Sequence, residues 1–106
     1  MAWLYLVAAG LLEIGWPVGI NLAENPDRRI AGIVTAVLFM AGSGTCLWLA
    51  QKQIPMGTAY AVWTGIGAVG TLLTGIWFYG EPASVMRLGS AFLIVAGIVG
   101  LKLAHG

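Results

Sequence analysis

Residues 3–22 read WLYLVAAGLLEIGWPVGINL, and this stretch decides the fold. A helix of this length rises about 30 Å, which matches the thickness of the hydrocarbon core of a bilayer. The stretch has a single charged residue, Glu13, near its middle. An ionised carboxylate there costs about 2.5–3.5 kcal/mol on insertion scales, and such groups usually belong to ion, proton or ligand pathways. The sequence therefore predicts a membrane-spanning helix that carries a functional acid.

The composition fits a membrane protein along the whole chain. Of its 106 residues, 59% are hydrophobic and 8% are charged, and the mean hydropathy is +0.91. A soluble domain has about a quarter of its residues charged. The net charge is +1 and the sequence has no basic patch, so nucleic-acid binding has no support. The single cysteine, Cys46, lies in an apolar run, so we expect no disulfide, no metal site and no cofactor.

The chain is predicted to cross the membrane four times within one domain, residues 1–106. The expected spans are about 3–22, 30–50, 57–79 and 88–104. The links between them are short and polar, and each contains a proline, as connections between neighbouring helices do. We therefore predict an all-α integral membrane protein with four transmembrane helices per subunit.

Three residues share a helical face with Glu13 and predict its surroundings. Gly10, Trp16 and Pro17 lie three or four positions away, which places them on the same side of the helix. Gly10 would leave space beside the acid, and Trp16 would bring an indole ring and an N–H donor. Pro17 lacks the N–H that would bond the carbonyl of Glu13, so we expect a kink at the acid.

The third span is predicted to add an aromatic and polar face. Its first part, residues 57–67, reads GTAYAVWTGIG and places on one face Tyr60, Trp63, Thr64 and Gly67. We expect Tyr60 to hydrogen-bond Glu13, and Trp63 to stack on a bound cation. Gly65 and Gly67 lower the helix propensity in mid-span, which would permit a bend.

The second and fourth spans each supply one candidate feature. Ser43 is expected to orient the carboxylate of Glu13, although its hydroxyl could instead bond a carbonyl of its own helix. In the fourth span Gly89, Leu93 and Gly97 recur every four residues. Small residues let membrane helices pack closely, so these three residues are the predicted dimer interface.

The charge distribution bears on assembly. One chain has a single deep acid, and four helices are too few to enclose a ligand path, so we expect a homodimer with both Glu13 side chains facing one cavity. With the N-terminus inside, two basic residues would be cytoplasmic and three external: Lys52 and Lys102 against Arg28, Arg29 and Arg87. This gives almost no orientation signal. We therefore predict an antiparallel, dual-topology dimer suited to alternating access, a single orientation being the alternative.

Together these features resemble the small multidrug resistance family over the whole chain. The resemblance rests on the length, the four spans, the acid in the first span, residues 57–67, and the pattern Leu93-Ile94-x-x-Gly97-Ile98. It implies a proton-coupled exporter of cations, an antiparallel dimer in which Glu13 binds either protons or substrate. The roles of Tyr60 and Trp63, and with them Ser43, carry over by the same resemblance.

Within that family the details are similar to the guanidinium-exporter subtype. They are Glu13-Ile14-Gly15-Trp16 and Trp63-Thr64-Gly65, whereas Pro17 stands where a small residue is usual and Asn21 where a lysine is common. The resemblance implies guanidinium-type cations and protons as partners, and a multi-pass protein of a bacterial inner or plasma membrane. Two alternatives stay open: an exporter of quaternary ammonium or aromatic cations, and an accessory subunit of a heteromeric transporter.

Overall fold

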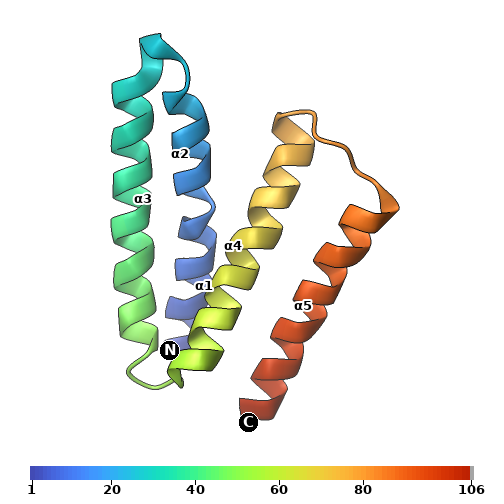
Figure 1. Cartoon of the computed structure of the whole chain (residues 1–106). Helices are drawn as coiled ribbons and strands as arrows, with labels where there is room; N and C mark the ends of the chain where they lie inside the picture. Colours follow the sequence, from blue (N-terminus) through green and yellow to red (C-terminus); the bar gives the residue numbers. More distant parts are fainter. Residues whose placement is uncertain (106) are drawn as a thin grey trace.

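The computed structural model describes residues 1–105, and all of its regular elements are helical (Figure 1). The elements are α1 (Ala2–Glu13), α2 (Gly15–Ala23), the short 3-10 helix η1 (Pro26–Arg28), α3 (Arg29–Ala50), α4 (Met56–Phe78) and α5 (Val85–His105). In this part of the chain four segments are long and apolar enough to cross a membrane, and α1 with α2 forms the first of them. The prediction of an all-α protein with four membrane helices is confirmed. The last helix begins at Val85 rather than near residue 88.

The first span is interrupted directly after the acid. α1 ends at Glu13, and the amide of Ile14 donates to the carbonyl of Leu11 at 3.2 Å before the helix resumes at Gly15. Pro17 has no N–H to offer the carbonyl of Glu13, so the regular bond across this point cannot form. Ile14 nevertheless keeps helical torsion angles (φ −64°, ψ −33°), and the span continues from Ala2 to Ala23, so the kink expected at the acid stays a prediction.

Glycines bring α3 against the first span. A Cβ atom at Gly19 would lie 2.6 Å from the backbone nitrogen of Ala36, and one at Gly32 would lie 2.6 Å from the carbonyl oxygen of Gly19. These distances leave no room for a side chain, so the backbones of α2 and α3 lie in direct contact. As a result α3 runs alongside α1 and α2 over their whole length (Figure 1).

A small hydrophobic core fixes α4 against α1. Its fully buried large side chains are Leu6 from α1, Ile54 from the link before α4, and Val62 from α4. Ala50 and Ala59 close it at the end of α3 and the start of α4. Because this cluster lies at the N-terminal end of α1, it fixes the point from which α4 starts its path beside the first span (Figure 1).

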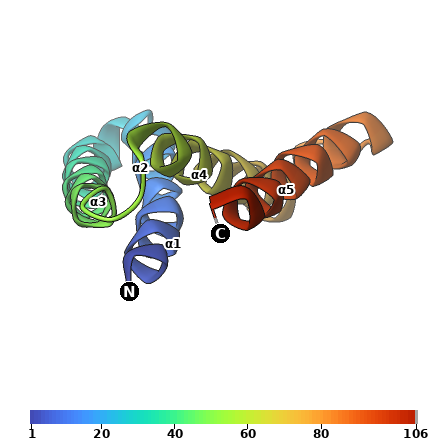
Figure 2. The same cartoon turned by 90° about the horizontal axis from the view of Figure 1, so that it is seen from below.

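The molecule is flat, and α5 is its least buried helix. The chain measures 48 × 34 × 17 Å, so its thickness is less than about two helix diameters of 10–12 Å. Seen from below, α5 extends to one side, away from α3 (Figure 2). Its contact with α4 forms at Gly65, where a Cβ atom would lie 2.9 Å from Cδ1 of Ile98. Leu93 is 70% exposed, and Gly89 and Gly97 have no neighbouring atom within 4 Å of an ideal Cβ.

Candidate functional site

Glu13 lines a cavity in the middle of the first span. The cavity has a volume of about 350 Å³ and lies between the α1–α2 segment and α4. Its lining residues are Glu13, Trp16, Pro17, Thr64, Gly67, Ala68 and Thr71. Five of the predicted site residues therefore meet around one space, although they come from segments about 50 residues apart in the sequence.

Gly67 provides the place where the Glu13 side chain lies. A Cβ atom at Gly67 would be 2.6 Å from Cγ of Glu13 and 3.1 Å from its Cβ. No side chain can occupy this position while Glu13 keeps its place. The sequence predicts Gly67 as a lining or bending residue, and the structure gives it a steric role next to the acid.

The two other glycines of the predicted site have packing roles. A Cβ atom at Gly10 would lie 2.6 Å from Cβ of Ile66, so Gly10 brings α1 close to α4 and is not part of the cavity lining. Gly65 contacts α5. The helix α4 runs without interruption from Met56 to Phe78, and the bend expected at Gly65 and Gly67 stays a prediction.

Ser43 joins three helices beside the acid. Its side chain is fully buried, and its hydroxyl donates to the carbonyl of Ala9 on α1 at 2.7 Å. The same oxygen accepts from the indole N–H of Trp63 on α4 at 2.7 Å and lies 3.3 Å from Oε1 of Glu13. The hydroxyl therefore reaches across to α1 and does not bond a carbonyl of α3.

This network fits both protonation states of the acid. A hydroxyl has one hydrogen to donate and two lone pairs to accept with. The bond to Ala9 uses the hydrogen of Ser43 and the bond from Trp63 uses one lone pair. A protonated Glu13 can donate to the second lone pair, whereas an ionised Glu13 can share the hydrogen with Ala9. Neither state leaves the serine without partners.

Trp16 and Tyr60 differ in how they relate to the acid. Trp16 lines the cavity, and within residues 1–105 its buried indole N–H has no hydrogen-bond partner. Tyr60 lies outside the lining; its side chain is 56% exposed, and its ring lies 5.4 Å from that of Trp63, tilted by 59°. In the single chain Tyr60 therefore borders the site through Trp63.

Thr71 is a lining residue that the predicted site does not include. It lies four positions after Gly67, on the same face of α4, and this spacing could have identified it. Thr64, which was predicted, donates its hydroxyl hydrogen to the carbonyl of Tyr60 at 2.8 Å. Its lone pairs stay available to a ligand, so the threonine acts toward the cavity as an acceptor.

The cavity has the chemistry of a site for a small cation or a proton. It combines one carboxylate with acceptor hydroxyls and an aromatic ring. Among the described residues no group of three or more His, Cys, Asp or Glu side chains could hold a metal ion. A cation with N–H groups can donate to the carboxylate and lie against the ring.

Comparison with known proteins gives matches over most of the chain. The family described as Small Multidrug Resistance protein matches residues 1–95. A protein of Yersinia pseudotuberculosis named Guanidinium exporter is 54% identical over 104 residues, which covers 98% of this chain and 99% of that protein. Proteins with the same name from Escherichia coli (strain K12) and Salmonella typhimurium are each 49% identical over 104 residues, covering 98% of this chain and 98% of theirs.

Proposed function

The chain belongs to the small multidrug resistance family, and we propose that it exports guanidinium and small guanidinyl cations in exchange for protons. With four membrane-spanning helices and this family, it is a multi-pass protein of the bacterial inner membrane. The relatives named Guanidinium exporter match almost the whole chain, which supports a transporter rather than an enzyme.

The position of Glu13 carries the proposal. Its carboxylate lies in a cavity beside the middle of the first span, with its stem against Gly67 and Oε1 within 3.3 Å of Ser43. A planar guanidinium can donate two parallel hydrogen bonds to the two oxygens of a carboxylate. A proton occupies the same oxygens, so cation and proton exclude each other. That competition couples export of the cation to uptake of protons.

The aromatic and hydroxyl neighbours give the site its preference for a flat cation. Trp16 lines the cavity and offers a ring face on which a guanidinium can stack, whereas Trp63 lies outside the lining and bonds Ser43. Ser43, fixed between Ala9 and Trp63, orients the carboxylate for a ligand that bonds both oxygens.

The transporting unit in this proposal is an antiparallel homodimer. The chain is 17 Å thick, and in its described part the predicted interface is open: Leu93 is 70% exposed, and an ideal Cβ at Gly89 or Gly97 has no neighbour within 4 Å. The exposed ring of Tyr60 is available to a second subunit. Two copies in opposite orientations would bring two Glu13 carboxylates to one cavity and would have the inverted symmetry that alternating access uses.

Proton release on addition of guanidinium tests the proposal. In weakly buffered detergent solution, guanidinium chloride should release protons from the purified protein, and Glu13→Gln should abolish the release. Glu24→Gln is the matched control, because Glu24 is an exposed acid outside the cavity. A Glu13→Gln protein that still binds guanidinium and releases protons would contradict the mechanism.

The same measurement separates the two alternatives. Proton release by bulky quaternary ammonium cations, at concentrations equal to those of guanidinium, would favour a multidrug exporter. Trp16 argues against that outcome because its indole occupies part of the cavity wall next to the acid. Full binding without exchange in vesicles that contain this chain alone would favour an accessory subunit of a heteromeric pair.

A further inference from the structure

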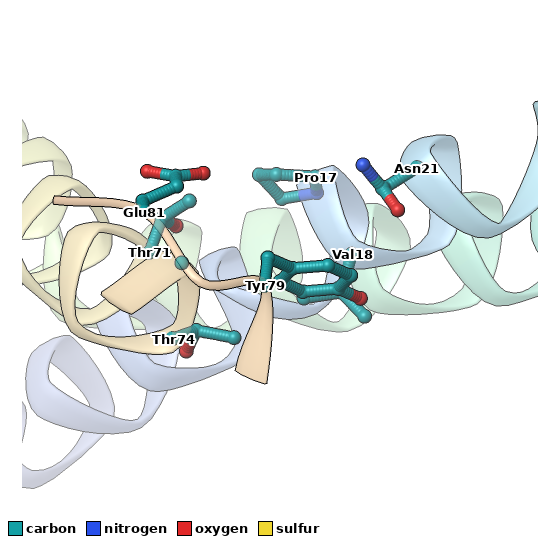
Figure 3. Close-up of a pocket in the computed structure, with 8 residues that line it drawn as sticks. Pro17, Val18, Asn21, Thr71, Thr74, Tyr79 and Glu81 are labelled. Carbon is teal, nitrogen blue, oxygen red and sulfur yellow. The ribbon is translucent and has the colours of Figure 1, made fainter. Parts of the chain in front are cut away.

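A second cavity lies next to the Glu13 cavity, near the C-terminal end of α4. Its volume is about 200 Å³. The residues that give it its character are Pro17, Asn21, Thr71, Thr74, Tyr79 and Glu81, from α2, α4 and the loop after α4 (Figure 3). Pro17 and Thr71 line both cavities. The two spaces are therefore neighbours along one path between α2 and α4.

The loop after α4 places the carboxylate of Glu81 over the helix it has just left. Gly80 has a φ of +68°, a left-handed conformation that favours glycine. The chain reverses there, and the amide of Glu81 donates to the carbonyl of Gly75 at 3.1 Å. A Cβ atom at Gly75 would lie 2.5 Å from Oε1 of Glu81, so the carboxylate rests on the bare backbone of α4.

The two acids of the path are held in the same way. Glu13 lies against Gly67 and Glu81 lies against Gly75, eight residues further along α4. This spacing corresponds to about 12 Å along the helix axis, and Thr71 lies midway on the same face. A small cation that left Glu13 toward this end of α4 would therefore meet a second carboxylate about two helical turns away.

The electrostatics of the second cavity favour a cation. Glu81 lies at the C-terminal end of α4, which carries the negative end of the helix dipole. Within the described residues the lining includes no lysine or arginine. The hydroxyl of Thr74 donates its hydrogen to the carbonyl of Gly70 at 2.8 Å, so toward a ligand it can only accept. The carboxylate of Glu81 and the hydroxyl of Thr74 can therefore both accept hydrogen bonds from a cation.

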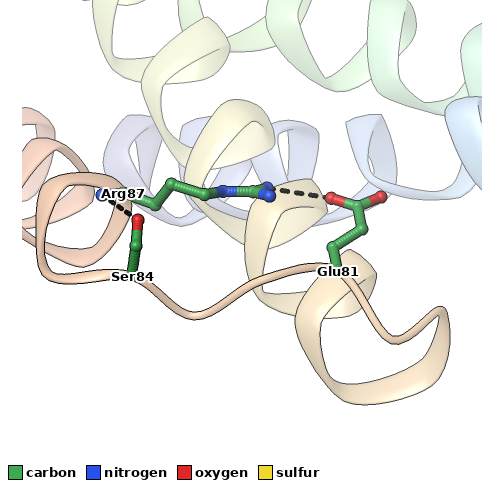
Figure 4. A network of polar contacts seen from close by, with 3 residues as sticks. All are labelled: Glu81, Ser84 and Arg87. Atoms are coloured by element: carbon green, nitrogen blue, oxygen red, sulfur yellow. Dashed lines mark hydrogen bonds and ion pairs between the residues drawn. The ribbon is translucent and has the colours of Figure 1, made fainter.

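Glu81 already holds a guanidinium group, that of Arg87. One terminal nitrogen of Arg87 donates to Oε1 of Glu81 at 2.9 Å, while the backbone amide of Arg87 donates to Ser84 at 3.2 Å (Figure 4). The side chains of Arg87 and Glu81 are 30% and 47% exposed. Exposed ion pairs of this kind are weak, so a free cation of the same chemistry can displace the arginine.

We propose that Glu81 and this cavity form a second, transient binding site for guanidinium-type cations, between the Glu13 cavity and the aqueous phase. The side chain of Arg87 competes with the cation for the carboxylate of Glu81: it dissociates when the cation binds and binds again when the cation leaves. The identity of the cation rests on the proposed function, whereas the site itself rests on Glu81, Arg87 and the shared lining of the two cavities.

The test compares two variants that break the same ion pair. In a Glu13→Gln background, guanidinium chloride is titrated while the backbone amide resonances of Gly80 and Glu81 are followed by NMR. Sodium chloride at equal ionic strength is the control for screening. Glu81→Gln should abolish the saturable shift, and Arg87→Gln should lower the half-saturating concentration at least threefold. Glu24→Gln is the matched acid-to-amide control and should change neither.

The opposite signs of the two effects separate a binding site from a structural ion pair. If the pair only orders the loop, both variants lose it and both should shift the titration in the same direction, which would overturn the proposal. Amides of Gly80 and Glu81 that do not respond to guanidinium would also overturn it. In both of those cases exchange of guanidinium for protons by the unmodified protein would stand.

The proposed exchange of guanidinium for protons can be contradicted independently of the second site. Absence of proton release from the unmodified protein would contradict it, while the NMR titration would still report on Glu81. If the Glu13→Gln protein does not fold, the unmodified protein is titrated at guanidinium concentrations far above those that complete proton release. A second set of shifts at Gly80 and Glu81 is then the expected result, and its absence would refute the second site.

Discussion

At the scale of single residues, a missing methyl group decides where the Glu13 carboxylate lies. A Cβ atom on residue 67 would be 2.6 Å from Cγ of Glu13, closer than real Cβ atoms approach other atoms. Gly67→Ala should therefore displace the acid and lower guanidinium affinity at least tenfold, measured by proton release. Alanine favours a helix over glycine by up to about 1 kcal/mol, so the backbone effect of the substitution should not lower the thermal unfolding temperature.

Gly44→Ala is the matched control for this prediction. Gly44 lies within α3, and an ideal Cβ there has no neighbour within 4 Å. The substitution offers the same gain in helix propensity without a steric conflict, so binding should be unchanged. If Gly67→Ala binds guanidinium as tightly as Gly44→Ala does, the prediction of a steric role for Gly67 is wrong.

The residue scale also separates what the sequence could predict from what it could not. Glu13 was evident because a charge in an apolar span is costly, and its neighbours Trp16 and Pro17 followed from helical spacing. The hydrogen bonds of Ser43 to Ala9 and from Trp63 could not be derived, because they depend on how three helices cross. Glu81 gave no signal, since acids are common in loops and its placement depends on the turn at Gly80.

At the scale of elements, the break is an interruption of the helical hydrogen bonds between α1 and α2, where the backbone of Ile14 keeps a helical conformation. Pro17→Ala would supply the N–H that the carbonyl of Glu13 lacks, and an interior proline costs a helix about 3 kcal/mol. We expect the variant to be more stable, to slow amide exchange near Ile14, and to transport more slowly, because Pro17 lines both cavities. Hydrogen exchange and guanidinium uptake into vesicles measure these effects.

Pro26→Ala is the control for the proline effect. Pro26 begins η1, where its missing N–H has no partner to lose, so transport should be unaffected. Unchanged amide exchange at Ile14 together with unchanged transport in Pro17→Ala would show that the break has no function.

The elements themselves were largely predictable, and their contacts were not. Four apolar runs separated by short links with prolines specify four membrane helices. The packing of Gly65 could not be predicted, because its neighbour Ile98 belongs to α5 and the sequence does not show that the two helices meet there. In the same way Gly10 was expected to leave room by the acid, yet Ile66 of α4 fills that room.

At the scale of the whole molecule, the chain does not by itself enclose a path across a membrane. It is 17 Å thick, and most of α5 faces away from the rest of the molecule. Its basic residues lie at both ends of the helices: Lys52, just after α3, and Lys102, near the end of α5, are at the same end of the molecule (Figure 1). The three arginines lie at the opposite ends of these helices. This near balance is the basis for expecting both orientations in one membrane.

The orientation of the chain can be biased by charge, and activity should follow. Gln51→Lys with Gln53→Lys changes the balance from two against three to four against three, which favours a cytoplasmic N-terminus. Lys52→Gln with Lys102→Gln changes it to zero against three and favours the reverse. Each double variant expressed alone should lose transport, because an antiparallel dimer needs both orientations. Expressed together, the two should restore it, a result that damage to folding by the substitutions cannot produce.

A single cysteine at the C-terminus, in a chain whose only native cysteine, Cys46, is replaced by alanine, reports the side of the tail. In the unmodified protein the tail should be labelled from both sides, and labelling from the cytoplasmic side alone would exclude the antiparallel homodimer.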